Sequence, residues 1–145
     1  MNKKSFNERV ERISQSPNPP PFDCQDRIKI LSDIRDRKCH IVKVEGNDQH
    51  PSYTYSVGLW HHFGHPEFIT FSQSEQSGEQ LIDDMQKLVK VGQPPAIQHP
   101  SGQPPEDYPV KLQPITDEQW SRNFLSLADW FYDHDFFPVL ELFPN

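Results

Sequence analysis

The sequence contains little cysteine, little glycine and no long hydrophobic run. Its 145 residues include two cysteines and six glycines. Two cysteines without a Cys-x-x-Cys pair form no dense disulfide pattern, which favours a reducing, cytoplasmic location. No run of about 18 apolar residues is present, so we expect no membrane span. The basic N-terminus leads into no apolar segment, so no secretory signal is expected.

The sequence also has fewer basic than acidic residues. Fourteen lysines and arginines face 21 aspartates and glutamates, which gives a formal net charge of −7. This balance argues against nucleic acid as a partner, because nucleic-acid-binding domains carry a basic face. It suits a basic protein partner instead, since an acidic surface speeds encounter with one. The sequence also lacks Gly-x-Ser-x-Gly and phosphate-binding glycine loops, so nucleotide enzymes and serine hydrolases are not expected.

The composition fits a single small domain with an aromatic core. Hydrophobic residues make up 34% of the chain and aromatics 12%, and there are fifteen prolines. Aromatic side chains bury large areas, so they partly compensate for the low apolar content. We expect residues 1–22 to form an N-terminal helix and a proline-rich linker, and residues 23–145 to form one α+β domain.

Hydrophobic periodicity predicts four helices. The first has an apolar face made by Phe6, Val10 and Ile13. The second starts after Asp23, a good N-cap, and we expect its buried stripe to be Ile28, Leu31 and Ile34. The third begins with a capping box of Ser77 and Gln80 and ends before Gly92. Its apolar face is made by Leu81, Ile82, Met85, Leu88 and Val89. The fourth has a second capping box and one apolar face: Thr116 with Gln119, then Trp120, Phe124, Leu127, Ala128 and Phe131.

Strand patterns occur between these helices. The clearest is an alternation of apolar with small polar residues over 53–59, where Tyr53, Tyr55, Val57 and Leu59 share one side. It should form a hairpin with a strand over 68–71. Further strands are expected over 39–44, 110–112 and 139–143, with a long proline-rich loop over 93–109. The fold class is therefore α+β, with an antiparallel or mixed sheet of four or five strands flanked by helices.

A histidine-rich loop is the main candidate for chemistry. His61, His62 and His65 lie within five residues, and Glu67 follows. His61 and His65 have the i, i+4 spacing of helical zinc ligands, but Gly64 and the proline after His65 disfavour that helix. A loop zinc site using His61, His65 and Glu67, a general acid–base role, and a purely structural turn stay open. In an extended segment His65 and Glu67 project to the same side, so Glu67 could orient a histidine proton or join it as a ligand.

The C-terminal part carries acidic and aromatic clusters. Asp129, Asp133 and Asp135 could bind a divalent cation, but a solvated acidic face is the simpler interpretation. Phe131 should point inward. Trp130 and Tyr132 either join the core or form a partner surface, and the core is the favoured alternative.

The segment from Tyr53 to Trp60, followed by Phe63-Gly64-His65-Pro66-Glu67-Phe68, resembles a bacterial family known as domain of unknown function 4262. The helix ending at Gly92 and the C-terminal segment from Trp130 to Asn145 are also similar. Lys38-Cys39 stands where the family often has Gly-Trp. The resemblance covers about residues 28–145 and implies no activity, because the family has no established one. A fold-level likeness to suppressor-of-fused-like domains, some of which are thought to be immunity proteins, is a weaker guide to function.

Two functions are therefore compared. The first is a non-enzymatic protein-binding module, of immunity type or similar, that binds a basic partner. The second is a small enzyme that depends on a metal or on histidine and uses the His-Pro-Glu loop. The residues expected to contribute to binding in this loop and beside it are Tyr55, Trp60, His61, His62, Phe63, His65 and Glu67. The sequence predicts no cofactor, with zinc as the alternative.

Overall fold

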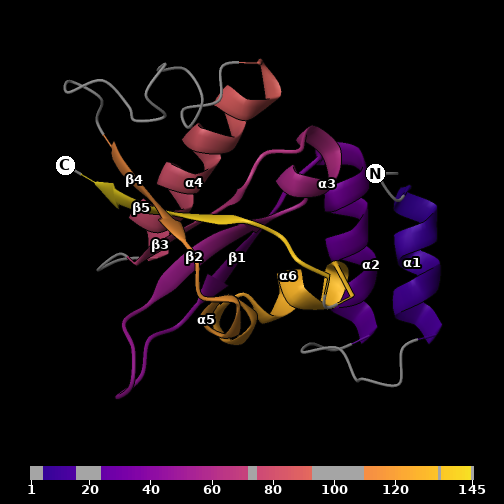
Figure 1. The fold of residues 1–145 in the computed structure, drawn as a ribbon, viewed down its shortest axis with the longest axis horizontal. Coiled ribbons are helices and arrows are strands. Elements are labelled where there is room, and N and C mark those ends of the chain that lie inside the picture. The colour runs from indigo at the N-terminus through magenta and orange to yellow at the C-terminus, as the bar shows by residue number, and fades with distance from the viewer. Residues whose placement is uncertain (1–4, 16–23, 72–74, 93–109, 134, 145) are drawn as a thin grey trace.

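The computed structural model describes residues 5–15, 24–71, 75–92, 110–133 and 135–144. In these residues, five strands form one mixed sheet in the order β1-β2-β3-β5-β4 (Figure 1). The strands are β1 (His40–Val44), β2 (Tyr53–Val57), β3 (Glu67–Phe71), β4 (Val110–Ile115) and β5 (Val139–Pro144). Strands β3 and β5 are parallel, and every other neighbouring pair is antiparallel. The predicted α+β fold with a mixed sheet is confirmed.

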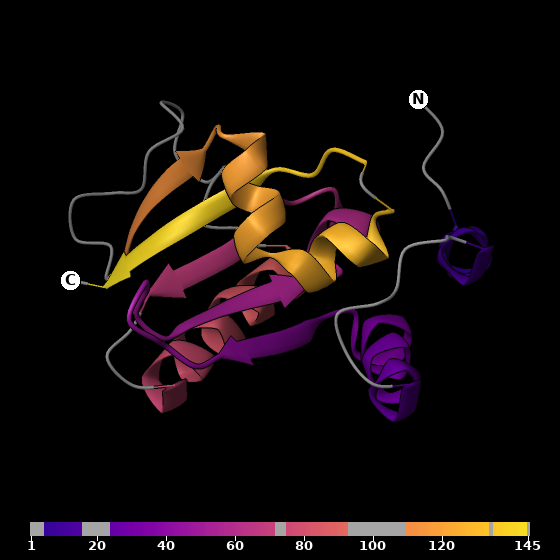
Figure 2. The ribbon, with the colours of Figure 1, turned by 90° about the horizontal axis from the view of Figure 1, so that it is seen from below.

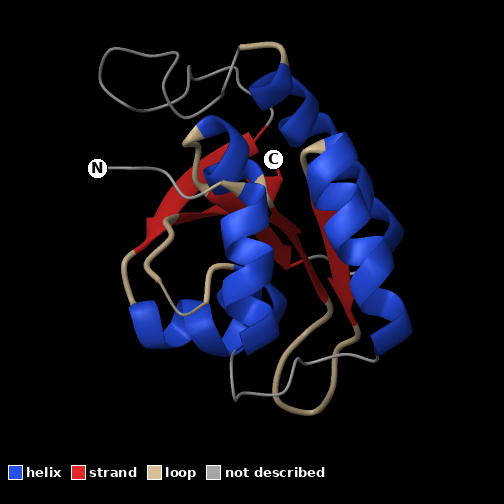
Figure 3. Cartoon of the chain, turned by 90° about the vertical axis from the view of Figure 1, so that its right-hand side faces the viewer, coloured by secondary structure: helices blue, strands red, loops and turns tan. Residues whose placement is uncertain are grey.

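The helices lie on both faces of this sheet. They are α1 (Phe6–Gln15), α2 (Cys24–Ser32) with its π-helical extension η1 (Asp33–Arg37), α3 (Leu59–Phe63), α4 (Glu75–Lys90), α5 (Glu118–Phe124) and α6 (Ser126–Phe131). Helix α4 packs on β1, β2 and β3 from one side, and α6 contacts β2 from the other (Figure 2). Figure 3, coloured by secondary structure, shows the helices arranged around the strands. None of the helices in the described ranges has the length and apolar character needed to cross a bilayer.

Two apolar clusters stabilise the sheet, one on each face. The cluster under α5 and α6 contains the aromatic side chains that the composition suggested, including Tyr55, Phe131 and Tyr132. The cluster under α4 is aliphatic for the most part and is centred on Ile82 and Phe68. Strand β2 is buried along its whole length, because both of its faces are covered. The favoured core placement of Trp130 and Tyr132 is confirmed, since they are 7% and 1% exposed.

The predicted buried stripe of the second helix is confirmed at Leu31 and Ile34 and is wrong at Ile28. Ile28 is 76% exposed, whereas Ile30 and Ile34 are 4% and 0% exposed. Ile30 and Ile34 also have helical i, i+4 spacing, so the periodicity alone could not choose between two overlapping stripes. The α-helix then changes to a π-helical turn at Asp33, and Lys38 ends it with a positive φ of 69°.

The predicted fourth helix is wrong as a single element, because it is broken at Leu125. This residue is fully buried and has φ −102° and ψ 54°, outside the helical region. Two tyrosines of β2 stabilise the break. The Tyr53 hydroxyl donates to the Phe124 carbonyl at 2.9 Å, and the Leu127 amide donates to the Tyr55 hydroxyl at 3.1 Å. Sheet side chains thus replace helical hydrogen bonds that the break removes.

Two of the predicted helix starts are also wrong. The Asp117 carboxylate, not Thr116, accepts the capping hydrogen bond, from the Trp120 amide at 3.2 Å. Helix α4 begins at Glu75, so Ser77 lies inside the helix and not at its N-cap. The predicted apolar face of α4 and its end before Gly92, which has a φ of 79°, are correct. The predicted loop over 93–109 lies outside the described residues.

Candidate functional site

Glu67, at the start of β3, is the centre of a buried hydrogen-bond network. Its side chain is 0% exposed. The Ser56 hydroxyl donates to Glu67 Oε1 at 2.8 Å, and the Tyr132 hydroxyl donates to Glu67 Oε2 in a short hydrogen bond. Three backbone amides complete the set, those of Gly58, Leu59 and Trp60 at 3.0, 3.3 and 3.1 Å. The carboxylate therefore satisfies the free N–H groups at the beginning of α3.

Gly58 makes this arrangement possible. It has a φ of 118°, and a Cβ atom here would lie 2.8 Å from the Lys38 carbonyl oxygen. Only glycine allows the chain to turn from β2 directly into α3 at this point, because any side chain would clash with the backbone. The predicted strand over 53–59 therefore ends at Val57, and Leu59 becomes the first residue of a helix.

Burial and hydrogen bonding act on Glu67 in opposite directions. Desolvation raises the pKa of the Glu67 carboxyl above its ordinary value, and the hydrogen bonds from Tyr132, Trp60 and Ser56 oppose this. Backbone N–H groups can only donate, so they favour the ionised carboxylate. The pKa of the Tyr132 phenol is raised well above its usual range, because the phenol is buried and donates its hydrogen bond to the Glu67 carboxylate. Glu67 thus acts as an acceptor in this network.

Helix α1 contributes a cation to the same region. The Arg9 Nε atom donates to His61 Nδ1 at 2.8 Å. The Arg9 guanidinium carbon also lies 4.9 Å from the centre of the Tyr132 ring and 5.8 Å from that of Phe131. Since Nδ1 accepts this hydrogen bond, the His61 ring is neutral with its proton on Nε2. The backbone amide of His61 in turn donates to the Tyr132 hydroxyl at 3.2 Å.

His65 and Glu67 are both buried but do not interact as the sequence suggested. His65 Nδ1 donates to the Pro66 carbonyl at 2.8 Å, and the His65 ring packs on Phe68 at 5.1 Å between centroids. Its Nε2 atom is buried without a hydrogen-bond partner. Burial lowers the pKa of His65, so its imidazole is neutral near pH 7. The His-Pro-Glu segment therefore has two separate sets of contacts.

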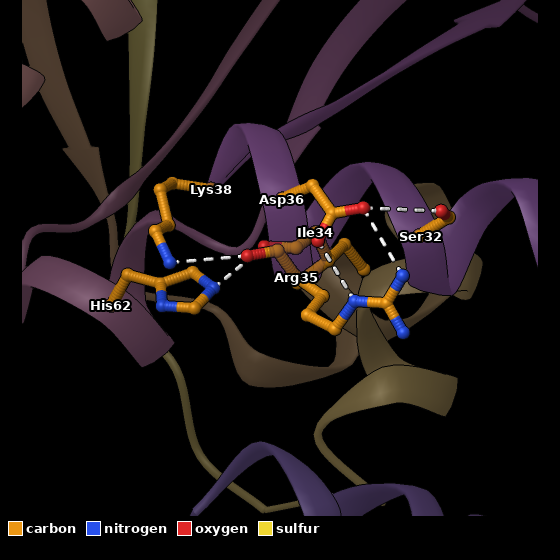
Figure 4. Close-up of polar contacts among 6 residues, drawn as sticks. All are labelled: Ser32, Ile34, Arg35, Asp36, Lys38 and His62. Atoms are coloured by element: carbon orange, nitrogen blue, oxygen red, sulfur yellow. Dashed lines mark hydrogen bonds and ion pairs between the residues drawn. The ribbon is translucent and has the colours of Figure 1, made fainter.

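His62 forms a hydrogen bond with the first half of η1. Its Nε2 atom donates to the Ile34 carbonyl at 2.6 Å, next to Arg35, whose carbonyl accepts from Lys38 (Figure 4). A π-helical turn shifts the hydrogen-bonding register of the backbone, and here a side chain from α3 bonds to one of its carbonyls. On the surface of this turn, Arg35 forms an ion pair with Asp36 at 2.8 Å, visible in the same figure.

The remaining predicted binding residues have different surroundings. Tyr55 is 1% exposed and supports the helix break, and Trp60 packs against the aromatic cluster. Phe63 is 40% exposed at the end of α3. The structure does not gather His61, His65 and Glu67 into a ligand set. Across the described ranges, no three histidine, cysteine, aspartate or glutamate side chains are grouped so that they could hold a metal ion.

The acidic cluster is less solvated than the favoured interpretation implied. Asp129 is only 9% exposed and lies 3.8 Å from the Arg122 side chain. Asp133 and Asp135 both pair with Arg12 of α1, at 2.8 and 3.3 Å. A sequence pattern could not reveal these pairings, because Arg12 lies more than a hundred residues away in the chain.

A groove opens where β4, β5 and α5 meet, and sequence reasoning did not identify it. The cavity has a volume of about 290 Å³. Its apolar lining includes Pro66, Pro114, Ile115, Phe136, Phe137, Pro138, Val139 and Leu140. Its polar lining is Thr116, Glu118, Arg122 and Asp135. We call it the Phe136 groove, after a side chain that is 62% exposed. None of the predicted binding residues is among the lining residues of this groove, although Pro66, between His65 and Glu67, is one of them.

These features define a small α+β domain with a buried carboxylate network and a largely apolar surface groove. The sequence model of the family described as a domain of unknown function, DUF4262, matches residues 33–144. The chain belongs to this family, as its motifs suggested. No curated protein and no solved structure matches the chain. The likeness to suppressor-of-fused-like domains stays a prediction.

Proposed function

We propose that the protein is a non-enzymatic protein-binding module that binds a basic partner through the Phe136 groove. The groove itself carries the proposal. Pockets that bind other molecules are concave, mostly apolar and largely preformed, with a few polar groups at defined places. Three prolines among the lining residues restrict the backbone, which supports a preformed shape.

The charges around the groove indicate the chemistry of the partner. Glu118 and Asp135 contribute two carboxylates, and Asp135 also pairs with Arg12 of α1 at 3.3 Å. Arg122, the one cation among the lining residues, lies 3.8 Å from Asp129. The whole chain has a formal net charge of −7. An apolar side chain flanked by lysine or arginine would therefore fit the groove, with the apolar group inside and the cations at its edge. An immunity-type role, in which an acidic protein blocks a basic one, is one such function.

No specific observation favours the alternative function, a small enzyme that uses His65 and Glu67. Such an enzyme needs both groups at one site that a substrate can enter. Glu67 has five donors to its carboxylate, and His65 contacts Pro66 and Phe68 instead. We therefore do not propose it.

The proposal can be tested with defined peptides. The first probe is an acetylated and amidated tripeptide with leucine between two lysines, and the control probe has leucine between two glutamates. We expect the lysine peptide to shift the NMR signals of Ile115, Phe136 and Leu140, with millimolar affinity that weakens as salt is raised. The glutamate peptide should leave these signals unchanged.

A photoreactive amino acid at position 136 then identifies the natural partner. The matched control is the same substitution at position 28, because Ile28 is also exposed but lies on α2. We expect a basic protein to be cross-linked at position 136 and not at position 28. Equal shifts by both peptides, or no shifts by either, would overturn the proposal.

A further inference from the structure

Helix α1 places a buried arginine on the domain, although it lies outside the residues that the family shares. The family match begins at residue 33, whereas α1 spans Phe6–Gln15. Arg9 is 9% exposed, whereas the side chains of Arg12 and Arg122 are 42% and 49% exposed. Burying a cation is costly unless its surroundings compensate. The surface beneath Arg9 must therefore stabilise a guanidinium.

Three features of that surface suit an arginine. The face of the Tyr132 ring lies 4.9 Å from the guanidinium carbon, which is cation–π distance. The Tyr132 hydroxyl donates to the Glu67 carboxylate, which increases the electron density of the ring and strengthens this attraction. His61 Nδ1 accepts from Arg9 Nε at 2.8 Å and so fixes the orientation of the planar group.

This geometry favours arginine over lysine. A guanidinium is planar, stacks on aromatic rings and is weakly hydrated, whereas an ammonium is compact and strongly hydrated. At this position a single side chain must stack on the Tyr132 ring and also donate a hydrogen bond from its Nε atom to His61. An ammonium group at the end of a lysine has no nitrogen at the position of Arg9 Nε, so it cannot make both contacts.

Other side chains of α1 also contact the rest of the chain, including Ser14, whose hydroxyl accepts from Arg27 of α2. Ile13 is buried and Phe6 packs partly against the aromatic cluster. Arg12 pairs with Asp133 and Asp135, but its own side chain is 42% exposed, so these ion pairs contribute little. An isolated ten-residue helix is marginal in water. We therefore expect the loss of Arg9 to weaken the packing of α1 on the domain.

We propose that His61, Phe131 and Tyr132 form an arginine-binding site of this domain. Helix α1 fills the site within the chain, and an arginine on an amphipathic helix of a partner takes its place when α1 leaves. Helix α1 thus competes with the partner, with the advantage of being tethered. The site shares no lining residue with the Phe136 groove, although Tyr132 packs on Phe137 of that groove. The two sites use different residues, so the inference does not require that the groove binds a partner.

Chemical rescue of the full-length Arg9→Ala variant tests the site. N-ethylguanidinium replaces the atoms that the variant lacks, and n-propylammonium is the matched probe for a lysine. At concentrations about five times the dissociation constant, ethylguanidinium should raise the melting temperature of the variant by about 3 °C relative to the same concentration of propylammonium. The wild type, whose site is occupied, should show no such difference. Equal effects of the two cations on the variant would overturn the proposal.

A second experiment tests the partner helix directly. A synthetic peptide of residues 5–15 is added to Arg9→Ala, and binding is measured by calorimetry. The same peptide with Arg9→Lys is the control. We expect the arginine peptide to bind at least tenfold more tightly, and to bind wild type far more weakly than the variant. Equal binding of the two peptides would show that the surface recognises the apolar face of the helix and not arginine.

A third experiment tests the proposal if the Arg9→Ala variant does not fold. In that case Arg9→Met, which keeps most of the side-chain volume, is compared with Arg9→Lys in urea unfolding. An arginine-specific site predicts that lysine is no better than methionine. A lysine variant as stable as wild type would contradict the proposal.

Discussion

Replacing Glu67 by glutamine tests whether the buried network depends on an ionised carboxylate. The substitution keeps the shape of the side chain and turns one acceptor oxygen into an NH2 donor. Oε1 accepts from Ser56 and Leu59, and Oε2 accepts from Gly58, Trp60 and Tyr132. Either orientation of the amide brings its NH2 group against at least one backbone N–H, which cannot reverse its role.

The less costly orientation sets the expected magnitude. With the NH2 group at the Oε1 position, the Leu59 amide loses its acceptor, while the Ser56 hydroxyl can turn to accept. With the NH2 group at the Oε2 position, the amides of Gly58 and Trp60 both lose theirs. An unsatisfied buried N–H costs about 1–3 kcal/mol, and hydrogen bonds to a charged group contribute about 1.5–3 kcal/mol. We therefore expect Glu67→Gln to lower the free energy of unfolding by about 2–4 kcal/mol.

Urea unfolding followed by tryptophan fluorescence measures this change. The matched control is Glu79→Gln, because Glu79 is 47% exposed and pairs with Lys43 on the surface. It should change the free energy of unfolding by less than about 0.5 kcal/mol. If Glu67→Gln were equally mild, the reasoning would be refuted. The native carboxyl would then be protonated, because glutamine copies the shape and hydrogen-bonding of the neutral acid.

Three further predictions concern single residues. Gly58→Ala should destabilise by about 3 kcal/mol or more, whereas Gly64→Ala, at φ 65° with no atom within 4 Å of the added Cβ, should cost about 1 kcal/mol. Burial lowers the pKa of His65, so the unfolded chain binds a proton on this residue at a higher pH than the folded chain does. The free energy of unfolding therefore decreases as the pH drops below about 6.5. In His65→Gln the decrease in this free energy from pH 7 to pH 5 should be smaller. Burial raises the pKa of the Cys39 thiol, so in Cys24→Ser a thiol reagent should label the native protein far more slowly than the unfolded one.

The measurements for these predictions are direct. Urea unfolding compares the two glycine variants, and equal destabilisation would mean that the contact with the Lys38 carbonyl is unimportant. Unfolding at several pH values compares His65→Gln with wild type, and an unchanged pH slope would mean that this histidine is protonated in the fold. Mass spectrometry follows labelling of Cys39, and rapid native labelling would contradict its burial.

Local patterns predicted much of the fold. The alternation over 53–59 predicted β2, and the apolar face of α4 was correct to the residue. The closing Gly92 was also correct. These strands, helix faces and helix ends depend on residues close together in the chain, so the local sequence pattern predicts them. The errors arose where partners far apart in sequence decided the local structure. Tyr53 and Tyr55 stabilise the break at Leu125, which no helical pattern could indicate.

The candidate site shows the same division. The sequence identified Glu67 as notable but suggested histidine as its partner. Its actual partners include Tyr132, 65 residues away, and the amides of α3. The nearest sequence signal for α3 was Gly58, because a glycine at the end of a strand allows an abrupt turn. Arg9 gave no signal at all, since an arginine on an amphipathic helix usually faces solvent.

The amino-acid sequence by itself determined the class of fold, the strands, the acidic balance and the family, because composition and short-range periodicity contain that information. Only the tertiary structure decided which charged groups are buried and what each one contacts. Burial and pairing depend on segments such as α1, β3 and α6 meeting in space. Desolvation and hydrogen bonding act over a few ångströms in space, whatever the separation along the chain.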